Sequence, residues 1–152
     1  MFRNQLRAGS GFTLIELLVV IGVIASILVY VIPVAYGSVR KSRLTIIAMN
    51  MRNVTKAVED YIYTEGSEML QASESNLEWL DTDFLVDKEY LPSKPKNVEI
   101  EWKDPDISDG TATVKVVYTK DDVDIDKLRE IWAEIEEDSG KAVVYRKLAK
   151  YW

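Results

Sequence analysis

An uncharged apolar segment near the N-terminus constrains this chain more than any other feature. No Asp, Glu, Lys or Arg occurs from Leu17 to Val39, and most of these 23 side chains are large and apolar. As an α-helix, the segment extends about 34 Å, enough to cross a hydrocarbon core about 30 Å thick. It is too long for the apolar core of a secretory signal peptide, and no small-residue cleavage site follows it. We therefore predict a membrane-spanning helix.

The charges on either side of this segment predict its orientation. Residues 1–11 are polar and contain two cations, Arg3 and Arg7. Because positively charged flanks tend to stay in the cytoplasm, we expect a single-pass precursor in the cytoplasmic membrane with its N-terminus inside. Arg40, Lys41 and Arg43 end the apolar segment on its other side.

A helical pattern continues beyond Val39, but on one face only. The polar face carries Arg52, Lys56, Glu59 and Asp60, and Gly66 is a plausible end of the helix. We predict one helix over residues 12–65. The apolar stripe of its second half, spaced at steps of three and four, consists of Leu44, Ile47, Ala48, Met51, Val54, Val58, Tyr61 and Ile62.

These patterns divide the chain into parts with different tasks. We expect an α+β fold, in which the long N-terminal helix packs on a small antiparallel sheet with one further C-terminal helix. The predicted parts are a leader at 1–11, a membrane-spanning half-helix at 12–39, an amphipathic half-helix packed on the head at 40–65, and a globular head at 66–152.

The head begins with a predicted short helix and a β-hairpin. Ser75 and Glu78 fit a capping box that opens a helix carrying Leu77, Leu80, Phe84 and Leu85. Alternating apolar residues predict strands over 98–103 and 111–118, and the Asp109-Gly110 pair between them is typical of a tight turn.

The last third of the head is predicted to contain a helix and a third strand. The helical period returns from Asp124 to Asp138, Gly140 ends it, and residues 142–148 alternate as a strand. The predicted order after the long helix is therefore β-β-α-β. We expect Trp102 and Trp132 to anchor the core.

The composition argues against an enzyme and against a nucleic-acid-binding protein. The chain has no cysteine and no histidine, so it lacks disulfides, thiolate ligands and the usual acid–base group near neutral pH. No arrangement of nucleophile and base is visible, and we expect no enzymatic activity, no cofactor and no metal site. The net charge of −6 lacks the basic excess that phosphate binding requires, and no nucleic-acid partner is expected.

The residues around Gly11 form a recognisable junction. Gly11-Phe12-Thr13-Leu14-Ile15-Glu16, followed by the apolar residues 17–21, resembles the leader junction of type IV prepilins and pseudopilins. The resemblance implies cleavage between Gly11 and Phe12 by a prepilin peptidase and N-methylation of the new Phe12 amine. It also implies a filament subunit at the cell surface or in the periplasm. The implied partners are identical or related pilin subunits, the peptidase, the inner-membrane assembly machinery and the lipid bilayer.

A charged Glu16 side chain at the edge of an apolar span is energetically unfavourable, so Glu16 needs a partner. The resemblance assigns Glu16, together with Thr13, to subunit assembly, with the Glu16 carboxylate paired to the Phe12 amine of a neighbouring subunit. The alternative is that Glu16 reaches the lipid headgroups or is protonated.

Pro33 is the other predicted special position of the span. Proline removes one helix hydrogen bond and kinks or loosens the preceding turn, and Gly22 and Gly37 add further soft points. The resemblance implies a segment that can stretch as subunits pack. The alternative is a simple kink in a membrane helix.

Two other patterns have ordinary explanations beside the functional ones. Asp104, Asp106 and Asp109 offer oxygen ligands for calcium, but their spacing does not fit the calcium-loop template, which favours a solvated hairpin tip. The tyrosines of the long helix suggest electron transfer, but aromatic residues are common at membrane boundaries and in core stripes. These tyrosines are Tyr30, Tyr36, Tyr61 and Tyr63.

Three functions remain open from the sequence. The favoured one is a structural subunit of a type IV pilus-like filament. A minor pseudopilin of a type II secretion or DNA-uptake machine has the same N-terminal features. A membrane-anchored binding domain is the third hypothesis.

Overall fold

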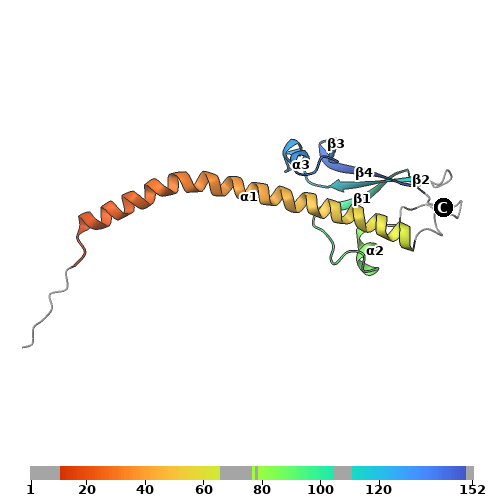
Figure 1. Ribbon diagram of the computed structural model, residues 1–152, viewed down its shortest axis with the longest axis horizontal. Coiled ribbons are helices and arrows are strands. Elements are labelled where there is room, and N and C mark those ends of the chain that lie inside the picture. Colours follow the sequence, from red (N-terminus) through yellow and green to blue (C-terminus); the bar gives the residue numbers. More distant parts are fainter. Residues whose placement is uncertain (1–10, 66–76, 78, 105–110, 150–152) are drawn as a thin grey trace, which may run out of the picture. The chain divides into compact units, whose positions relative to one another are not determined.

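The computed structural model describes residues 11–65, 77, 79–104 and 111–149, and it has the expected α+β fold. A long N-terminal helix, α1 (Leu14–Thr64), is followed by two short helices and an antiparallel sheet (Figure 1). The chain divides into two compact units, Met1–Arg40 and Lys41–Trp152, and α1 contributes to both. The prediction of a helix over residues 12–65 differs from the observed bounds by two residues at the start and one at the end.

The first unit consists, in its described part, of the first half of α1. All side chains from Leu14 to Arg40 are exposed, although most of them are apolar. The helix is long and apolar enough to cross a membrane. It continues through Pro33, whose ring nitrogen has no hydrogen to donate to the carbonyl of Val29. A locally weakened turn at Pro33 therefore stays a prediction.

The second unit has its own apolar core, in which the amphipathic half of α1 is a central element. The buried residues of α1 follow the predicted stripe, because steps of three and four place them on one helical face. Met51, Val54, Val58 and Ile62 are completely buried. They join side chains from α2, α3 and the sheet in one cluster between Leu44 and Leu148.

The sheet has four antiparallel strands in the order β1-β2-β4-β3. Strands β1 (Val98–Asp104) and β2 (Thr111–Tyr118) confirm the predicted hairpin pair, although the turn residues between them lie outside the described part of the chain. Residues 112, 114 and 116 of β2 are buried at every second position, and Val116 lies opposite Val144 of β4 (Lys141–Ala149). This alternation directs one face of the sheet into the core.

The prediction of a helix from Asp124 to Asp138 is wrong in its second half. Helix α3 (Ile125–Ile131) starts at the N-cap Asp124 and ends with Trp132 as its C-cap. The chain then forms a fourth strand, β3 (Glu136–Asp138), which pairs with β4. Ser139 and Gly140, between these strands, have φ values of 55° and 78°. Two consecutive positive φ values are typical of a type I′ hairpin turn, and the order is therefore β-β-α-β-β.

Helix α2 (Thr82–Asp87) begins later than the predicted capping box implies. Asp81 is its N-cap, and the Asp81 carboxylate accepts a hydrogen bond of 2.8 Å from the Phe84 backbone N–H. Ser75 and Glu78, the predicted box, lie outside the described residues. Leu77 and Leu80 are buried as expected, but they precede the helix.

The two tryptophans expected to anchor the core differ in burial. Trp132 is buried, as predicted, with 7% of its surface exposed. Trp102 is only partly buried, and its indole N–H donates to the Leu80 carbonyl oxygen at 3.3 Å. Its place on β1, an edge strand of the sheet, explains the difference, because an edge strand lacks a neighbour on one side.

Candidate functional site at the start of the long helix

The predicted processing junction lies just before helix α1. Gly11, Phe12 and Thr13 have no regular secondary structure, and all three are exposed. Phe12 exposes 75% of its surface. The bond between Gly11 and Phe12 is therefore outside the helix, where the backbone is open to another molecule.

Thr13 and Glu16 form a reciprocal cap at the start of α1, which the sequence interpretation missed. The Glu16 Oε2 atom accepts hydrogen bonds from the Thr13 backbone N–H at 2.9 Å and from the Thr13 hydroxyl at 2.8 Å. In return, the Glu16 N–H donates to the Thr13 hydroxyl oxygen at 3.3 Å. The signal was present in the sequence, since threonine followed three residues later by glutamate is the capping-box pattern. The cap also places a negative charge at the positive end of the helix dipole.

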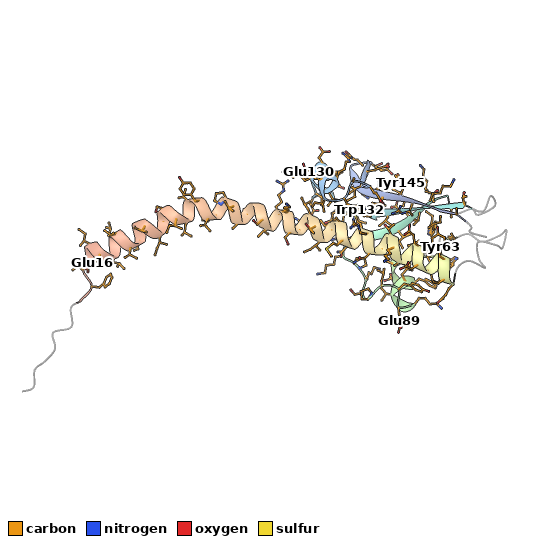
Figure 2. The ribbon with its side chains drawn as sticks, in the orientation of Figure 1. Glu16, Tyr63, Glu89, Glu130, Trp132 and Tyr145 are labelled. Atoms are coloured by element: carbon orange, nitrogen blue, oxygen red, sulfur yellow. The ribbon has the colours of Figure 1, made fainter. Side chains whose placement is uncertain are left out.

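The second carboxylate oxygen of Glu16 remains open to another donor. Both bonds described above go to Oε2, and no donor to Oε1 is present among the described residues. Phe12, Ile15, Val19 and Val20 line a shallow recess of about 330 Å³ beside the carboxylate. The start of α1 therefore presents one acceptor oxygen at an apolar surface (Figure 2).

The charged side chains of the second unit form ion pairs that connect its elements. Arg43 of α1 binds Asp122, which also accepts a hydrogen bond of 3.2 Å from the Tyr118 hydroxyl. Desolvation raises the pKa of Asp122, but the hydrogen bonds from Arg43 and Tyr118 outweigh it and leave the pKa below its ordinary value. This contact joins α1 to the segment after β2.

A second cluster lies across the strands of the sheet. The Lys115 Nζ atom is 3.0 Å from Glu101 and 2.9 Å from Asp138, and the Tyr145 hydroxyl donates to Asp138 at 2.9 Å. Hydrogen bonds from Lys115, Tyr145 and Ser139 lower the pKa of Asp138 to about 2. One residue of this cluster comes from each strand, so the cluster connects all four strands of the sheet.

A third cluster joins α1 to β4 and the segment before β3. The Arg146 Nε atom is 2.9 Å from Glu59, and its Nη2 atom is 2.9 Å from Glu134. Arg52 stacks on Trp132, with 5.0 Å from its guanidinium carbon to the ring centroid. These residues line a recess of about 350 Å³, in which Arg146 pairs with both Glu59 and Glu134.

The described residues add no side chains to the calcium-site hypothesis or to the hypothesis of electron transfer through tyrosines. Among the described residues, no group of three or more Asp and Glu side chains is arranged to hold a metal ion. Asp106 and Asp109, of the calcium hypothesis, lie outside this part of the chain. Tyr61 is buried and contacts Trp79, Phe84 and Tyr90 edge to face, which packs α2 and its flanks on α1.

In comparisons with known proteins, no family model, no curated protein and no solved structure matches this chain. Three features of the chain itself bear on its function: the junction at Gly11 and Phe12, the cap formed by Thr13 and Glu16, and the exposed apolar surface of α1.

Proposed function

We propose that the protein is a structural subunit of a type IV pilus-like filament. It is made as a single-pass membrane precursor, cleaved between Gly11 and Phe12, N-methylated at Phe12 and polymerised through α1. The observation that carries this proposal is the first half of α1, which is apolar and exposed on all sides and begins with a single carboxylate.

The exposed apolar surface of α1 supports a helix that moves between two apolar environments. In water, so much apolar surface is unfavourable, at roughly 25 cal/mol per Å². A lipid bilayer covers it in the precursor, and neighbouring copies of the same helix cover it in a filament. Because the side chains project in every direction, the helix can be enclosed on all sides (Figure 2).

Glu16 favours transfer of the first half of α1 from the bilayer into a filament. Its carboxylate is costly at the edge of the hydrocarbon, and its Oε1 atom lacks a donor in the described part of the subunit. Cleavage after Gly11 creates a new amine at Phe12, and the Phe12 amine of a neighbouring subunit would supply the missing positive donor. Such a pair is stronger in an apolar filament core than in water.

Mass spectrometry and electron microscopy together test the proposal. We expect mature protein to begin at methylated Phe12, and sheared cell-surface material to contain fibres of this subunit that disappear in a deletion strain. Gly11→Val is the matched control, because a larger residue at the junction blocks close approach of the peptidase and should leave Met1 in place.

The outcomes distinguish the proposed functions. Processed protein with fibres that persist in the deletion strain would favour a minor pseudopilin of a secretion or DNA-uptake machine. Unprocessed Met1 in the steady-state protein would contradict both filament roles and favour a membrane-anchored binding domain.

A further inference from the structure

The segment that follows strand β2 is fixed close to the point where α1 enters the second unit. Arg43 of α1 binds Asp122, and the Tyr118 hydroxyl donates to the same carboxylate at 3.2 Å. The Thr119 backbone N–H donates to the Asn97 carbonyl oxygen at 2.9 Å, which ties the segment to the residue before β1. These bonds fix its position relative to both α1 and the sheet.

Helix α3 continues the same end of the second unit. The side chain of its N-cap, Asp124, accepts a hydrogen bond of 3.4 Å from the Lys127 backbone N–H. Figure 1 shows α3 at the end of the second unit where α1 enters it, and strand β2 runs toward this end. We call residues 119–127 the base of the head.

The base lies close to the edge of the predicted membrane span, measured along α1. The uncharged segment ends at Val39, and Arg43 follows four residues later in one continuous helix, which is about 6 Å. Because helical side chains incline toward the N-terminus of their helix, the Arg43 guanidinium and Asp122 are expected at this level or closer to Val39. The headgroup layer on each side of a bilayer is about 5–8 Å thick. When residues 17–39 span a membrane, Asp122 is therefore within the headgroup layer.

We propose that the base of the head is a lipid-binding surface, which lies against phospholipid headgroups in the membrane-anchored form of the protein. The proposal rests on the membrane-spanning precursor of the proposed function and does not depend on the filament. At the base, Lys120 and Asp121 are exposed and have no ion-pair partner in the described part of the chain. A lysine ammonium binds lipid phosphate, and a carboxylate binds the ammonium group of phosphatidylethanolamine.

Arg43 and Lys41 contribute to this contact in different ways. Asp122 neutralises Arg43, so the bond that fixes the base is not lost to lipid phosphate. Lys41 is exposed, and no ion pair involves it among the described residues. It precedes Arg43 by two residues, which is about 200° around the helix axis. Lys41 therefore meets the headgroups on the side of α1 opposite the base, and contacts on both sides limit the tilt of the second unit on the membrane.

Depth measurements in vesicles test the proposal, and the absence of cysteine from the chain makes single labels specific. Full-length Asp121→Cys takes a spin label at the base and is reconstituted, at low protein-to-lipid ratio, into vesicles of phosphatidylethanolamine and phosphatidylglycerol. Lys147→Cys is the matched control, because exposed Lys147 pairs with Thr113, which is five residues and about 17 Å along β2 from Tyr118.

The measured quantity is the ratio of collisions with a nickel-chelating lipid headgroup to collisions with a water-soluble nickel complex. We expect this ratio to be several-fold higher for the Asp121→Cys label than for the Lys147→Cys label, because only the former lies in the headgroup layer. Equal ratios for the two labels would overturn the lipid contact.

A third label separates this inference from the proposed function. Ile27 lies near the middle of the uncharged segment, so an Ile27→Cys label in a spanning helix collides with oxygen dissolved in the hydrocarbon and not with the nickel complex. If the Ile27→Cys label is in hydrocarbon while Asp121→Cys behaves like Lys147→Cys, the inference alone is contradicted. An Ile27→Cys label in water contradicts the membrane-anchored precursor itself.

Cross-linking to lipid tests the contact without any variant. A carbodiimide condenses a carboxylate with the amine of phosphatidylethanolamine to an amide and takes up the water that is released. We expect lipid adducts on Asp121 but not on Glu89, an exposed acid whose neighbour Tyr90 is 2.6 Å from the Thr64 hydroxyl, about 31 Å along α1 from Arg43. Adducts on Glu89 as frequent as those on Asp121, or none on Asp121, would contradict the proposal.

Discussion

At the scale of single residues, Glu16 is the only acidic residue before Glu59, and its two carboxylate oxygens have different surroundings. One oxygen caps α1 through Thr13, and the other is open at an apolar surface. The cap explains how an isolated subunit keeps the carboxylate ordered. The open oxygen is the part that our proposal assigns to a neighbouring subunit.

A pair of substitutions separates these two roles of Glu16. Thr13→Ala removes the hydroxyl of the cap and keeps the carboxylate, at a cost of about 1 kcal/mol in helix stability. Glu16→Ala removes both the cap and the charge. If Glu16 acts between subunits, Glu16→Ala should abolish filaments while Thr13→Ala leaves most of them, as counted by electron microscopy. Equal filament loss in both variants, with normal membrane insertion, would assign Glu16 to capping only.

At the scale of elements, α1 joins two kinds of helix in one continuous segment. Its first half is exposed and apolar, and its second half buries one face in the head. The two methionines at positions 49 and 51 illustrate the difference. Met51 is completely buried, whereas Met49, two residues earlier, is 57% exposed.

Substitution of these methionines measures how much the packing of α1 against the head contributes to the free energy of unfolding. Met51→Ala should lower the free energy of unfolding by about 2–5 kcal/mol, because it leaves a cavity in the core. Met49→Ala should change it by less than about 0.5 kcal/mol. Tryptophan fluorescence during urea unfolding of detergent-solubilised protein measures both, since all four tryptophans follow residue 66. Similar losses in the two variants would contradict the observed orientation of α1.

The helix predicted from Asp124 to Asp138 is longer than the observed helix α3. Ile125, Leu128 and Ile131 do fall on α3, but Ile135 reaches the core from the segment between α3 and β3. A helix and a strand would both bury Ile135, so the apolar spacing alone did not distinguish them. The backbone pairing with β4 decides the question, because it supplies hydrogen-bond partners to residues 136–138.

At the scale of the whole molecule, each of the two units has a different relation to its surroundings. The described part of Met1–Arg40 buries no side chain, whereas Lys41–Trp152 contains the entire apolar core cluster. This division agrees with the proposal that the first unit is enclosed by lipid or other subunits. The head then needs only its own contacts to fold.

Truncation tests the independence of the second unit. A chain of residues 41–152 should be soluble without detergent and should unfold cooperatively in urea, because its core does not depend on the first 40 residues. Circular dichroism and size-exclusion chromatography measure both properties, with the full-length chain in detergent as the reference. Aggregation of the truncated chain, or gradual unfolding, would show that the first unit contributes to the stability of the head.

The long helix and its two kinds of surface followed from the sequence alone, because apolar runs and helical periods are local properties of the chain. The Thr13–Glu16 cap could also have been predicted from the local sequence, because its spacing matches the capping-box pattern. Only the tertiary structure decided that residues 136–138 form a strand, that Trp102 is half-buried at a sheet edge, and that Lys41 and Lys56 lack ion-pair partners among the described residues. Each of these depends on which distant segments pair and pack, which a local pattern does not contain.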